Sequence, residues 1–437
     1  MNKDIADIGF CVYDRGTFFP VAERLARQAK KVFYCRPQGE SFTTFAQYAL
    51  GDGHENIQFT ADFWKHKNEI DVFIFPDSND SDEGLQAELE GQGFGVWASK
   101  GASSLEQMRG QWLRKCEELG LPMPKTETIK GLTNLRLYLA EHEGEKLFVK
   151  ISRFRGDMET WETKTPSQVR NKLDYLSLKF GPFQDGITFY VQEAIETDIE
   201  GGSDTYNIHG NYPDEVILGY ERKGESYFAT VKKRSEMAPE IWSPSEAIVP
   251  FLRDSRYANF VSSEIRVADR KSYWLDPCYR CPSPAGEEQL EMYANFPEIV
   301  ARGAFGELVQ PEWAANFCGE AVIEYCGDRD GWKSLVVPEE VRQWVKLYAC
   351  GYCDGAYHFP PAQDPEAIGC AVGLGDTPEE VLDRLKEIRD ALKDCPVSLR
   401  IEPIADLFKE IEEAEAEGIP FSKEPMPEPA AVLEEAT

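Results

Sequence analysis

Short apolar runs alternate with amphipathic stretches through the first hundred residues. Runs at 8–13, 31–35 and 71–76 are rich in Ile, Val, Phe, Tyr and Cys, and a stretch with helical spacing occupies 20–30. Buried strands of a parallel sheet appear as continuous apolar runs, and helices that connect them keep successive strands parallel. We therefore expect an open parallel α/β sheet over residues 1–98.

The pattern changes after this region. Apolar residues at helical spacing over 103–119 predict a helix, and Gly120 with the prolines that follow predicts its end. Between 125 and 195 the order strand, helix, strand, helix, strand predicts a compact α+β lobe. Later strand-like runs with short connections predict an antiparallel sheet, and they lie at 215–220, 226–233, 260–268 and 271–276.

The length of 437 residues predicts two or three domains, because a domain takes about 150 residues. We expect an N-terminal α/β domain at 1–98 and a two-lobed domain at 99–290, whose small lobe covers about 125–195. A C-terminal α+β domain should follow at 291–417. Residues 418–437 are acidic and rich in proline, a composition that predicts a tail without fixed structure.

The charge narrows the classes of partner. The chain has 47 Lys and Arg against 77 Asp and Glu, a formal net charge of −30, which repels phosphate backbones and anionic lipids. We therefore expect no direct binding to duplex nucleic acid and no membrane partner. No apolar run reaches the roughly 18 residues of a spanning helix, and the start lacks a basic, apolar signal, so the expected location is the cytoplasm.

Eleven cysteines are scattered along the chain. An odd number of scattered cysteines favours reduced, buried thiols over a disulfide framework. Two CxxC pairs, at 278–281 and 350–353, have the local spacing of a structural zinc site, but they stand much farther apart than the roughly 15 to 20 residues usual for one. Buried thiols are the interpretation we favour, and zinc stays an alternative.

Candidate chemistry begins at the strand-like segment 147–151. Lys150 stands near the end of this apolar strand, and a loop containing Arg153 and Arg155 follows. Fixed positive charge and loop amides in this arrangement would suit a bound phosphate chain. Alternatively, Lys150 is an exposed lysine at the end of a strand beside a solvated turn.

Two acidic segments follow. A strand that ends in Gln192 and Glu193 leads into an acidic link, which offers backbone groups to an adenine edge and carboxylates to ribose hydroxyls. Farther on, Glu264 and Asp276 lie on consecutive strands, and as a hairpin these strands would bring both carboxylates together as Mg²⁺ ligands. Arg280 would then serve a transferred phosphoryl group. The alternative is a set of surface acids in a highly acidic protein.

The order of these segments resembles the ATP-grasp superfamily and, within it, the phosphoribosylamine-glycine ligases (glycinamide ribonucleotide synthetases). The resemblance runs from about residue 70 to about residue 400. The signatures that carry it are the strand lysine, the basic loop, the acidic link, the two carboxylates with the arginine, Val96 to Lys100 with Glu106 and Arg109, Leu119 to Pro122, Ala349 to Tyr352, and Gly375 to Glu380.

The resemblance implies an ATP-grasp fold and an ATP-binding, magnesium-dependent ligase that joins a small-molecule carboxylate to an amine. An acyl phosphate forms first, and ADP and phosphate are released. Mg²⁺, or Mn²⁺, would be the metal, and the assembly would be compatible with a homodimer. The implied roles are Lys150, Arg153 and Arg155 at the ATP phosphates, Gln192, Glu193, Ala194 and Ile195 at the adenine, Glu196 or Glu200 at the ribose, Glu264 and Asp276 at the metal, and Arg280 at the acyl phosphate.

The sequence also departs from the family pattern. Cys278 stands where the family has an asparagine metal ligand, and a thiol suits Mg²⁺ poorly. The glycine-rich phosphate loop is shortened, and the ligase's glycine-rich substrate segment and its N-terminal phosphate signature are not recognisable. Glycine and phosphoribosylamine are therefore doubtful substrates. Two alternatives stay open: an ATP-dependent kinase or carboxylase on the same fold, and a degenerate nucleotide-binding scaffold without turnover.

Overall fold

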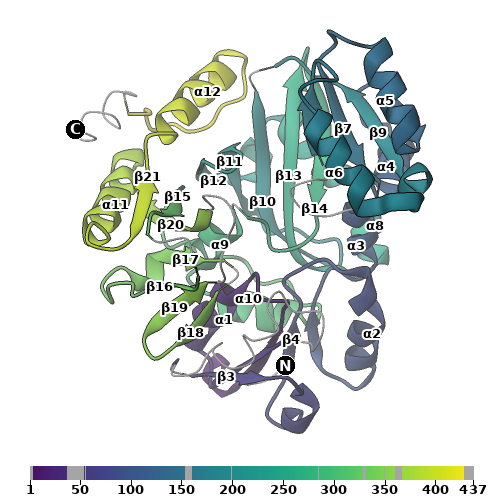
Figure 1. Cartoon of the computed structure of the whole chain (residues 1–437). Coiled ribbons are helices and arrows are strands. Elements are labelled where there is room, and N and C mark those ends of the chain that lie inside the picture. The colour runs from purple at the N-terminus through teal and green to yellow at the C-terminus, as the bar shows by residue number, and fades with distance from the viewer. Residues whose placement is uncertain are drawn as a thin grey trace.

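The computed structural model describes nearly the whole chain. The described ranges are 3–36, 54, 56–152, 160–197, 199–283, 285–327, 331–348, 350–359 and 367–427. Within them the strands form four sheets, shown in Figure 1. In this part of the chain no helix combines the length and the apolar character that crossing a membrane would require.

The first sheet is the expected open parallel one, with strand order β3-β2-β1-β4-β5. It lies at the bottom of Figure 1, where the N-terminus is marked. Its strands are β1 (Gly9–Tyr13), β2 (Lys31–Cys35), β3 (Ile57–Thr60), β4 (Val72–Ile74) and β5 (Gly95–Trp97), with helices α1 (Phe19–Ala26) and α2 (Glu83–Gly91). The apolar runs are buried because helices and neighbouring loops cover both faces.

Two helices connect this sheet to the next lobe, α3 (Ser103–Gln107) and α4 (Arg109–Leu119). Gly120 ends α4 with φ +67°, a left-handed conformation that glycine adopts without strain. The small lobe has strand order β6-β9-β7-β8. Its elements are β6 (Thr126–Lys130), α5 (Leu132–Glu141), β7 (Leu147–Ile151), β8 (Thr160–Thr163), α6 (Arg170–Phe180) and β9 (Thr188–Glu193).

A nine-stranded sheet forms the centre of the molecule, with order β14-β13-β10-β11-β12-β15-β20-β17 and β21 paired to β15. It stands beside the small lobe in Figure 1. The strands are β10 (Glu200–Ile208), β11 (Glu215–Arg222), β12 (Ser226–Lys233), β13 (Ala258–Ala268), β14 (Lys271–Cys278), β15 (Phe317–Tyr325), β17 (Val345–Leu347), β20 (Ala367–Gly375) and β21 (Val397–Arg400).

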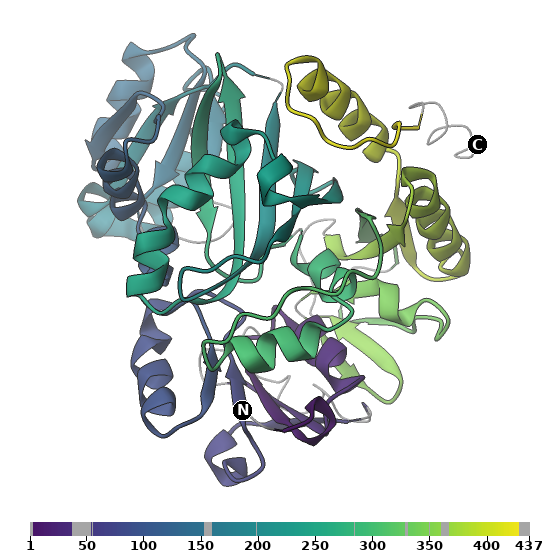
Figure 2. The same ribbon diagram turned by 180° about the vertical axis from the view of Figure 1, so that it is seen from behind.

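Helices cover the back of this sheet, as Figure 2 shows. There α7 (Pro239–Ala247) packs on β10, β13 and β14, and α8 (Val249–Asp254) follows it. The remaining helices are α9 (Gly286–Met292), α10 (Phe296–Gly303), α11 (Pro378–Ala391) and α12 (Ile404–Ala416), and a three-stranded sheet contains β16 (Lys333–Leu335), β18 (Gly351–Cys353) and β19 (Ala356–Phe359). Short 3-10 helices lie at Ile5–Asp7, Phe63–His66, Asp80–Asp82, Lys100–Ala102, Gly181–Gly186, Arg234–Glu236 and Arg342–Trp344.

Three features differ from the sequence prediction. The acidic link was expected to include Glu200 to Asp204, but these residues belong to the central strand β10. The boundary expected after residue 290 falls inside α9, and β15 and β20 continue the same sheet beyond it. The tail expected to lack structure begins with ordered chain, because Ile419 and Phe421 are buried.

Candidate functional site

Lys150 and Asp276 join the two lobes. Lys150, on β7 of the small lobe, has its Nζ 3.2 Å from Asp276 Oδ2 and 3.3 Å from the Leu275 carbonyl on β14. The lysine side chain is 6% exposed and that of Asp276 is 27% exposed, so this ion pair lies inside the contact between the lobes. The two residues that the sequence placed on opposite lobes therefore meet.

Glu264 lies beside Asp276 on the neighbouring strand. The two residues are cross-strand partners of β13 and β14, and the register shifts between Glu264 and Ile265. This bulge adds one residue, Leu275, to β14, so that Trp274 faces the core while Asp276 faces the small lobe. The hairpin predicted from the sequence brings the two carboxylates together.

Burial and charge act in opposite directions on these groups. Burial raises the pKa of Asp276, but the charges of Lys150 and Arg109 outweigh it and hold this pKa well below its usual range. Burial and the neighbouring carboxylates raise the pKa of Glu264 to about 8, although the Lys223 charge opposes this shift. Burial lowers the pKa of Lys150, and the Asp276 charge opposes that effect. One carboxylate is thus strongly stabilised as an anion and the other is not.

Two further cations occupy the same place. The Arg109 guanidinium, at the start of α4, donates to Asp276 Oδ1 and to the Thr160 hydroxyl. Lys223 Nζ, in the turn between β11 and β12, lies 3.7 Å from Glu264 Oε2. Arg109 is predicted only as part of the family resemblance, and no sequence pattern indicates Lys223, which looks like an ordinary turn lysine.

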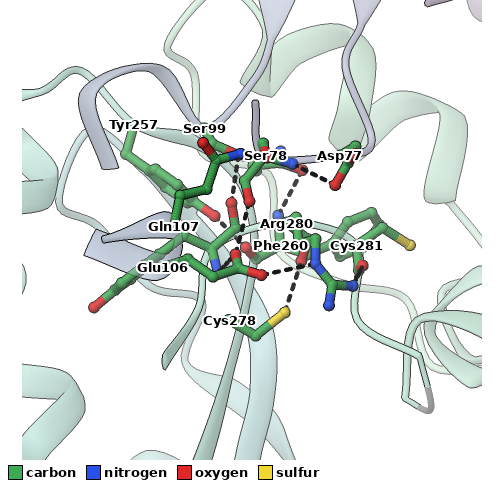
Figure 3. Close-up of polar contacts among 12 residues, drawn as sticks. Asp77, Ser78, Ser99, Glu106, Gln107, Tyr257, Phe260, Cys278, Arg280 and Cys281 are labelled. Carbon is green, nitrogen blue, oxygen red and sulfur yellow. Dashed lines mark hydrogen bonds and ion pairs between the residues drawn. The ribbon is translucent and has the colours of Figure 1, made fainter. Parts of the chain in front are cut away.

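Arg280 lies in a second network, drawn in Figure 3. Its Nε donates to Glu106 Oε1 over 2.8 Å, and the other oxygen of Glu106 accepts from the Tyr279 backbone N–H and from the Ser78 hydroxyl. Burial disfavours the charged guanidinium, but the Cys278 and Glu106 charges outweigh it and raise the pKa of Arg280. Glu106, on α3, therefore fixes both the side chain and the backbone at this position.

Cys278 points into the network around Arg280. Its Sγ donates to the Arg280 carbonyl oxygen at 3.8 Å. Figure 3 draws this contact. A thiol is a soft donor, so Cys278 does not suit the hard-cation site that it was expected to complete. Nor, among the residues that the structure describes, do the CxxC cysteines form a group of potential metal ligands.

Several groups of the expected adenine-binding segment already form hydrogen bonds within the small lobe. Glu193 donates its N–H to the Lys125 carbonyl and accepts from the Lys125 N–H through Oε1, while the Ala194 N–H donates to Lys146. The Gln192 side chain is buried and donates to Thr126. These contacts give Gln192, Glu193 and the Ala194 amide a structural role at the edge of the sheet.

The next residues of the link contact the central sheet. The Ile195 carbonyl accepts from Arg266, whose guanidinium also forms an ion pair with Glu200, and Glu196 is exposed. Arg153 and Arg155, the other expected phosphate-binding residues, lie outside the described residues.

Comparison of the sequence with protein-family models and with curated proteins found no match. Solved structures do match. Phosphoribosylamine-glycine ligase from Thermotoga maritima is 15% identical and gives a TM-score of 0.64, over 90% of this chain and 97% of that one. The biotin carboxylase domain of the Hydrogenobacter thermophilus 2-oxoglutarate carboxylase, solved with MgADP, ADP and bicarbonate, is 13% identical with a TM-score of 0.61, over 93% and 97%.

A third match is L-amino acid ligase from Bacillus licheniformis, 13% identical with a TM-score of 0.56, over 90% of this chain and 98% of that one. These likenesses cover nearly the whole chain at low identity, so they show its fold. The fold predicted from the order of the motifs is thereby confirmed: the chain has the ATP-grasp fold, with an N-terminal parallel α/β sheet.

Proposed function

We propose that this chain, with its ATP-grasp fold, is an ATP-dependent ligase that joins a carboxylate to an amine through an acyl phosphate. The observation that carries the proposal is the meeting of Lys150 with Asp276, with Glu264 beside it on the next strand. Similar structures include two ligases and a carboxylase domain bound to MgADP. They support ATP and Mg²⁺ as ligands of the place where Lys150, Glu264 and Asp276 come together, which we call the proposed cleft site.

Glu264 and Asp276 fit the metal. They offer hard oxygen ligands from adjacent strands at one register, and Mg²⁺ is usually held by one or two carboxylates together with substrate phosphates. In this structure Asp276 is paired with Lys150 and Arg109 instead. When bound, the metal would neutralise negative charge on the phosphates. Cys278 has no part in this proposed site.

Lys150 and Arg109 are the proposed phosphate-binding residues of the described chain. Both cations are paired with Asp276 in this structure. If Asp276 held a metal ion, Lys150 and Arg109 would be available to bind phosphate oxygens. Arg153 and Arg155 stay predicted phosphate-binding residues, and they lie outside the described part of the chain. We assign the adenine to the link at Ile195 and the ribose to Glu196 or Glu200.

Arg280 is proposed to bind the phosphoryl group that is transferred. Its guanidinium is held by Glu106, so it needs little reorganisation to receive charge that develops during the reaction. A carboxylate oxygen of the substrate attacks the γ-phosphorus, and the bond to ADP breaks. The amine nitrogen then attacks the acyl carbon, phosphate leaves, and the nitrogen loses a proton. The chain contributes positioning and charge.

The experiment that tests this function does not require the substrates to be known beforehand. The purified full chain is incubated with Mg²⁺, ATP, pools of carboxylic acids, and hydroxylamine, which captures any acyl phosphate as a hydroxamate. Hydroxamate and ADP formed only with acid, and lost in Asp276→Asn, support the proposal. Pools of amines then replace hydroxylamine to identify the acceptor.

Other outcomes favour the alternatives. ADP release that requires bicarbonate alone favours a carboxylase, and a stable phosphorylated product that no amine consumes favours a kinase. Binding of ATP without any ADP release in all pools favours a nucleotide-binding scaffold. Equal turnover in wild type and Asp276→Asn would exclude the proposed site.

A further inference from the structure

Three glutamates gather at a second place in the molecule. Glu287 and Glu288 lie in α9, and Glu320 lies on β15 of the central sheet. One carboxylate oxygen from each lies within 4.8 Å of the others. Ca²⁺ binds its oxygen ligands at about 2.3 to 2.6 Å, so two ligands of one ion lie at most about 5.2 Å apart. The spacing of the three oxygens therefore matches a single ion.

The three carboxyl groups are shielded from water. Glu287 is 5% exposed, Glu288 is fully buried and Glu320 is 3% exposed. Among the described residues, hydrogen-bond partners are lacking for both oxygens of Glu288 and for Oε2 of Glu287 and of Glu320. The other oxygen of Glu320 lies 3.5 Å from the Tyr348 hydroxyl, which donates to it. The Glu288 and Glu320 carboxyl groups act on each other as a hydrogen-bonding pair, so without a ligand they have only a shared proton between them.

Asp204 adds a fourth buried carboxyl group. Its Oδ2 accepts from the Tyr227 hydroxyl, and Tyr227 is the cross-strand partner of Glu320, so Asp204 lies beside the same part of the sheet. Asp204 is 3% exposed, and within the described chain its Oδ1 lacks a hydrogen-bond partner other than the Ser262 hydroxyl that acts on this carboxyl group. Its charge acts on Glu288, because it is one of the causes that raise the pKa of Glu288.

This arrangement is costly without a ligand. A buried acceptor without a donor is unfavourable, and buried carboxylates repel each other. Protonation would remove the charge but would supply only one donor for each carboxyl group. Burial raises the pKa of Glu287, and hydrogen bonds from its own backbone and from Ser283, followed by the charges of Arg280 and Lys346, oppose that effect. A divalent cation would satisfy the free oxygens and the charge together.

We propose that Glu287, Glu288 and Glu320 bind one hard divalent cation of the Mn²⁺, Mg²⁺ or Ca²⁺ class, with Glu288 as the ligand that offers both oxygens. The ligand atoms are all carboxylate oxygens, which these cations prefer. The oxygen spacing accommodates an ion and is too small for an organic ammonium group with its substituents. This site uses none of the residues proposed above to bind Mg²⁺ with ATP.

The cation would hold α9 against β15. Arg280 and Cys281 lie a few residues before α9, so fixing the start of this helix also fixes the end of the segment that carries Arg280. The site is therefore a structural one, and its occupancy does not depend on the ligase reaction.

The test separates the two metal sites by mutation. In the full chain, Glu264→Gln with Asp276→Asn removes the proposed cleft site, and this cleft-null chain is dialysed against Mn²⁺ without nucleotide. Bound manganese is counted by elemental analysis and by electron paramagnetic resonance. We expect about one Mn²⁺ per chain, and a further Glu288→Gln with Glu320→Gln should remove it. Glu324→Gln, on the same strand but partly exposed and paired with Arg400, is the matched control and should retain it.

A second measurement protects the test against a folding failure. If the Glu288→Gln, Glu320→Gln chain loses its circular dichroism signal, the single variant Glu287→Gln replaces it, with at least tenfold weaker Mn²⁺ binding expected. Absence of Mn²⁺, Mg²⁺ and Ca²⁺ from the cleft-null chain, even after refolding with each metal, would overturn the proposal. So would manganese that stays bound with unchanged affinity in all the glutamate variants. Binding of Zn²⁺ alone would overturn the assignment to hard cations.

Discussion

The side-chain nitrogen of Lys150 lies 3.2 Å from a carboxylate oxygen of Asp276, although the two residues are 126 positions apart in the sequence and belong to different lobes. Arg109 contacts the other oxygen of the same carboxylate. In this structure the two cations neutralise the charge of Asp276, whereas a bound metal and a phosphate chain would separate them from it. The same charges that we propose for nucleotide binding therefore link the two lobes. Nucleotide binding must exchange these ion pairs for contacts with phosphate and metal.

Lys150→Met should lower ATP-dependent hydroxamate formation by about 100- to 1,000-fold, because a preorganised charge at a phosphoryl group contributes on this scale. Methionine keeps most of the buried stem, so the small lobe should stay folded, as judged by circular dichroism. The rate at saturating ATP is the measurement. Lys146→Met, at a partly exposed lysine just before the same strand, is the control and should change the rate by less than a factor of two.

A second prediction concerns the glutamate that positions Arg280. Glu106→Gln should lower kcat about tenfold while leaving KM for ATP within a factor of two, since Glu106 orients Arg280, which is proposed to act on the phosphoryl group as it is transferred. Gln can still accept from the Tyr279 N–H but loses the charge that pairs with the guanidinium. Glu106→Asp should restore part of kcat. A rise in KM for ATP with constant kcat would contradict the positioning role.

Much of the fold could be predicted from the sequence because local patterns carry it. The apolar runs before residue 98, the helix that ends at Gly120 and the strand containing Lys150 each follow from composition and spacing over a few residues. Glu264 and Asp276 could be paired because two strands with a short connection form a hairpin. The contact between Lys150 and Asp276 could be predicted only from the order of the motifs along the whole chain, because the two residues are far apart in the sequence.

Other parts of the site could not be predicted, because burial there depends on distant segments. The sequence GEEQLEM in α9 has three acids in seven residues and looks like a surface helix, yet Glu287, Glu288 and Glu291 are buried. Lys223 lies in a hairpin turn, and only the folded sheet brings it near Glu264. Composition likewise predicted a tail without structure from residue 418, and it gave no sign that Phe421 packs on Tyr220 and Phe228.

The buried start of the tail gives a third prediction. Phe421 is 1% exposed, and Phe→Ala at such a site costs about 3 to 5 kcal/mol through lost burial and the cavity left behind. Phe421→Ala should therefore lower the thermal unfolding midpoint by several degrees in differential scanning calorimetry. Lys423→Ala, two residues on and exposed, should leave the midpoint nearly unchanged. Equal midpoints in both variants would mean that the tail does not stabilise the folded chain.

The fourth prediction concerns the pH dependence of stability. Burial raises the pKa of Asp204 from 3.8 to about 6, against the opposing hydrogen bonds from Ser262 and Tyr227. The folded chain then holds this proton while the unfolded chain releases it, so the stability contribution falls as pH rises from about 4 to about 6 and is constant above that. A difference of about two pKa units corresponds to about 3 kcal/mol.

Asp204→Asn should remove this loss, because asparagine carries no proton to release and its carbonyl can still accept from Tyr227. Urea unfolding in the presence of a chelator at pH 4 and pH 7 measures the effect. At pH 4 Asp204 is protonated in the folded chain but more than half ionised in the unfolded chain, whose side-chain pKa is 3.8, so a part of the loss has already occurred at this pH. Between pH 4 and pH 7 the variant should gain about 2 kcal/mol on the wild type. Parallel pH profiles of the two chains would show instead that Asp204 is ionised in the fold at pH 4, with a charged partner that holds it so.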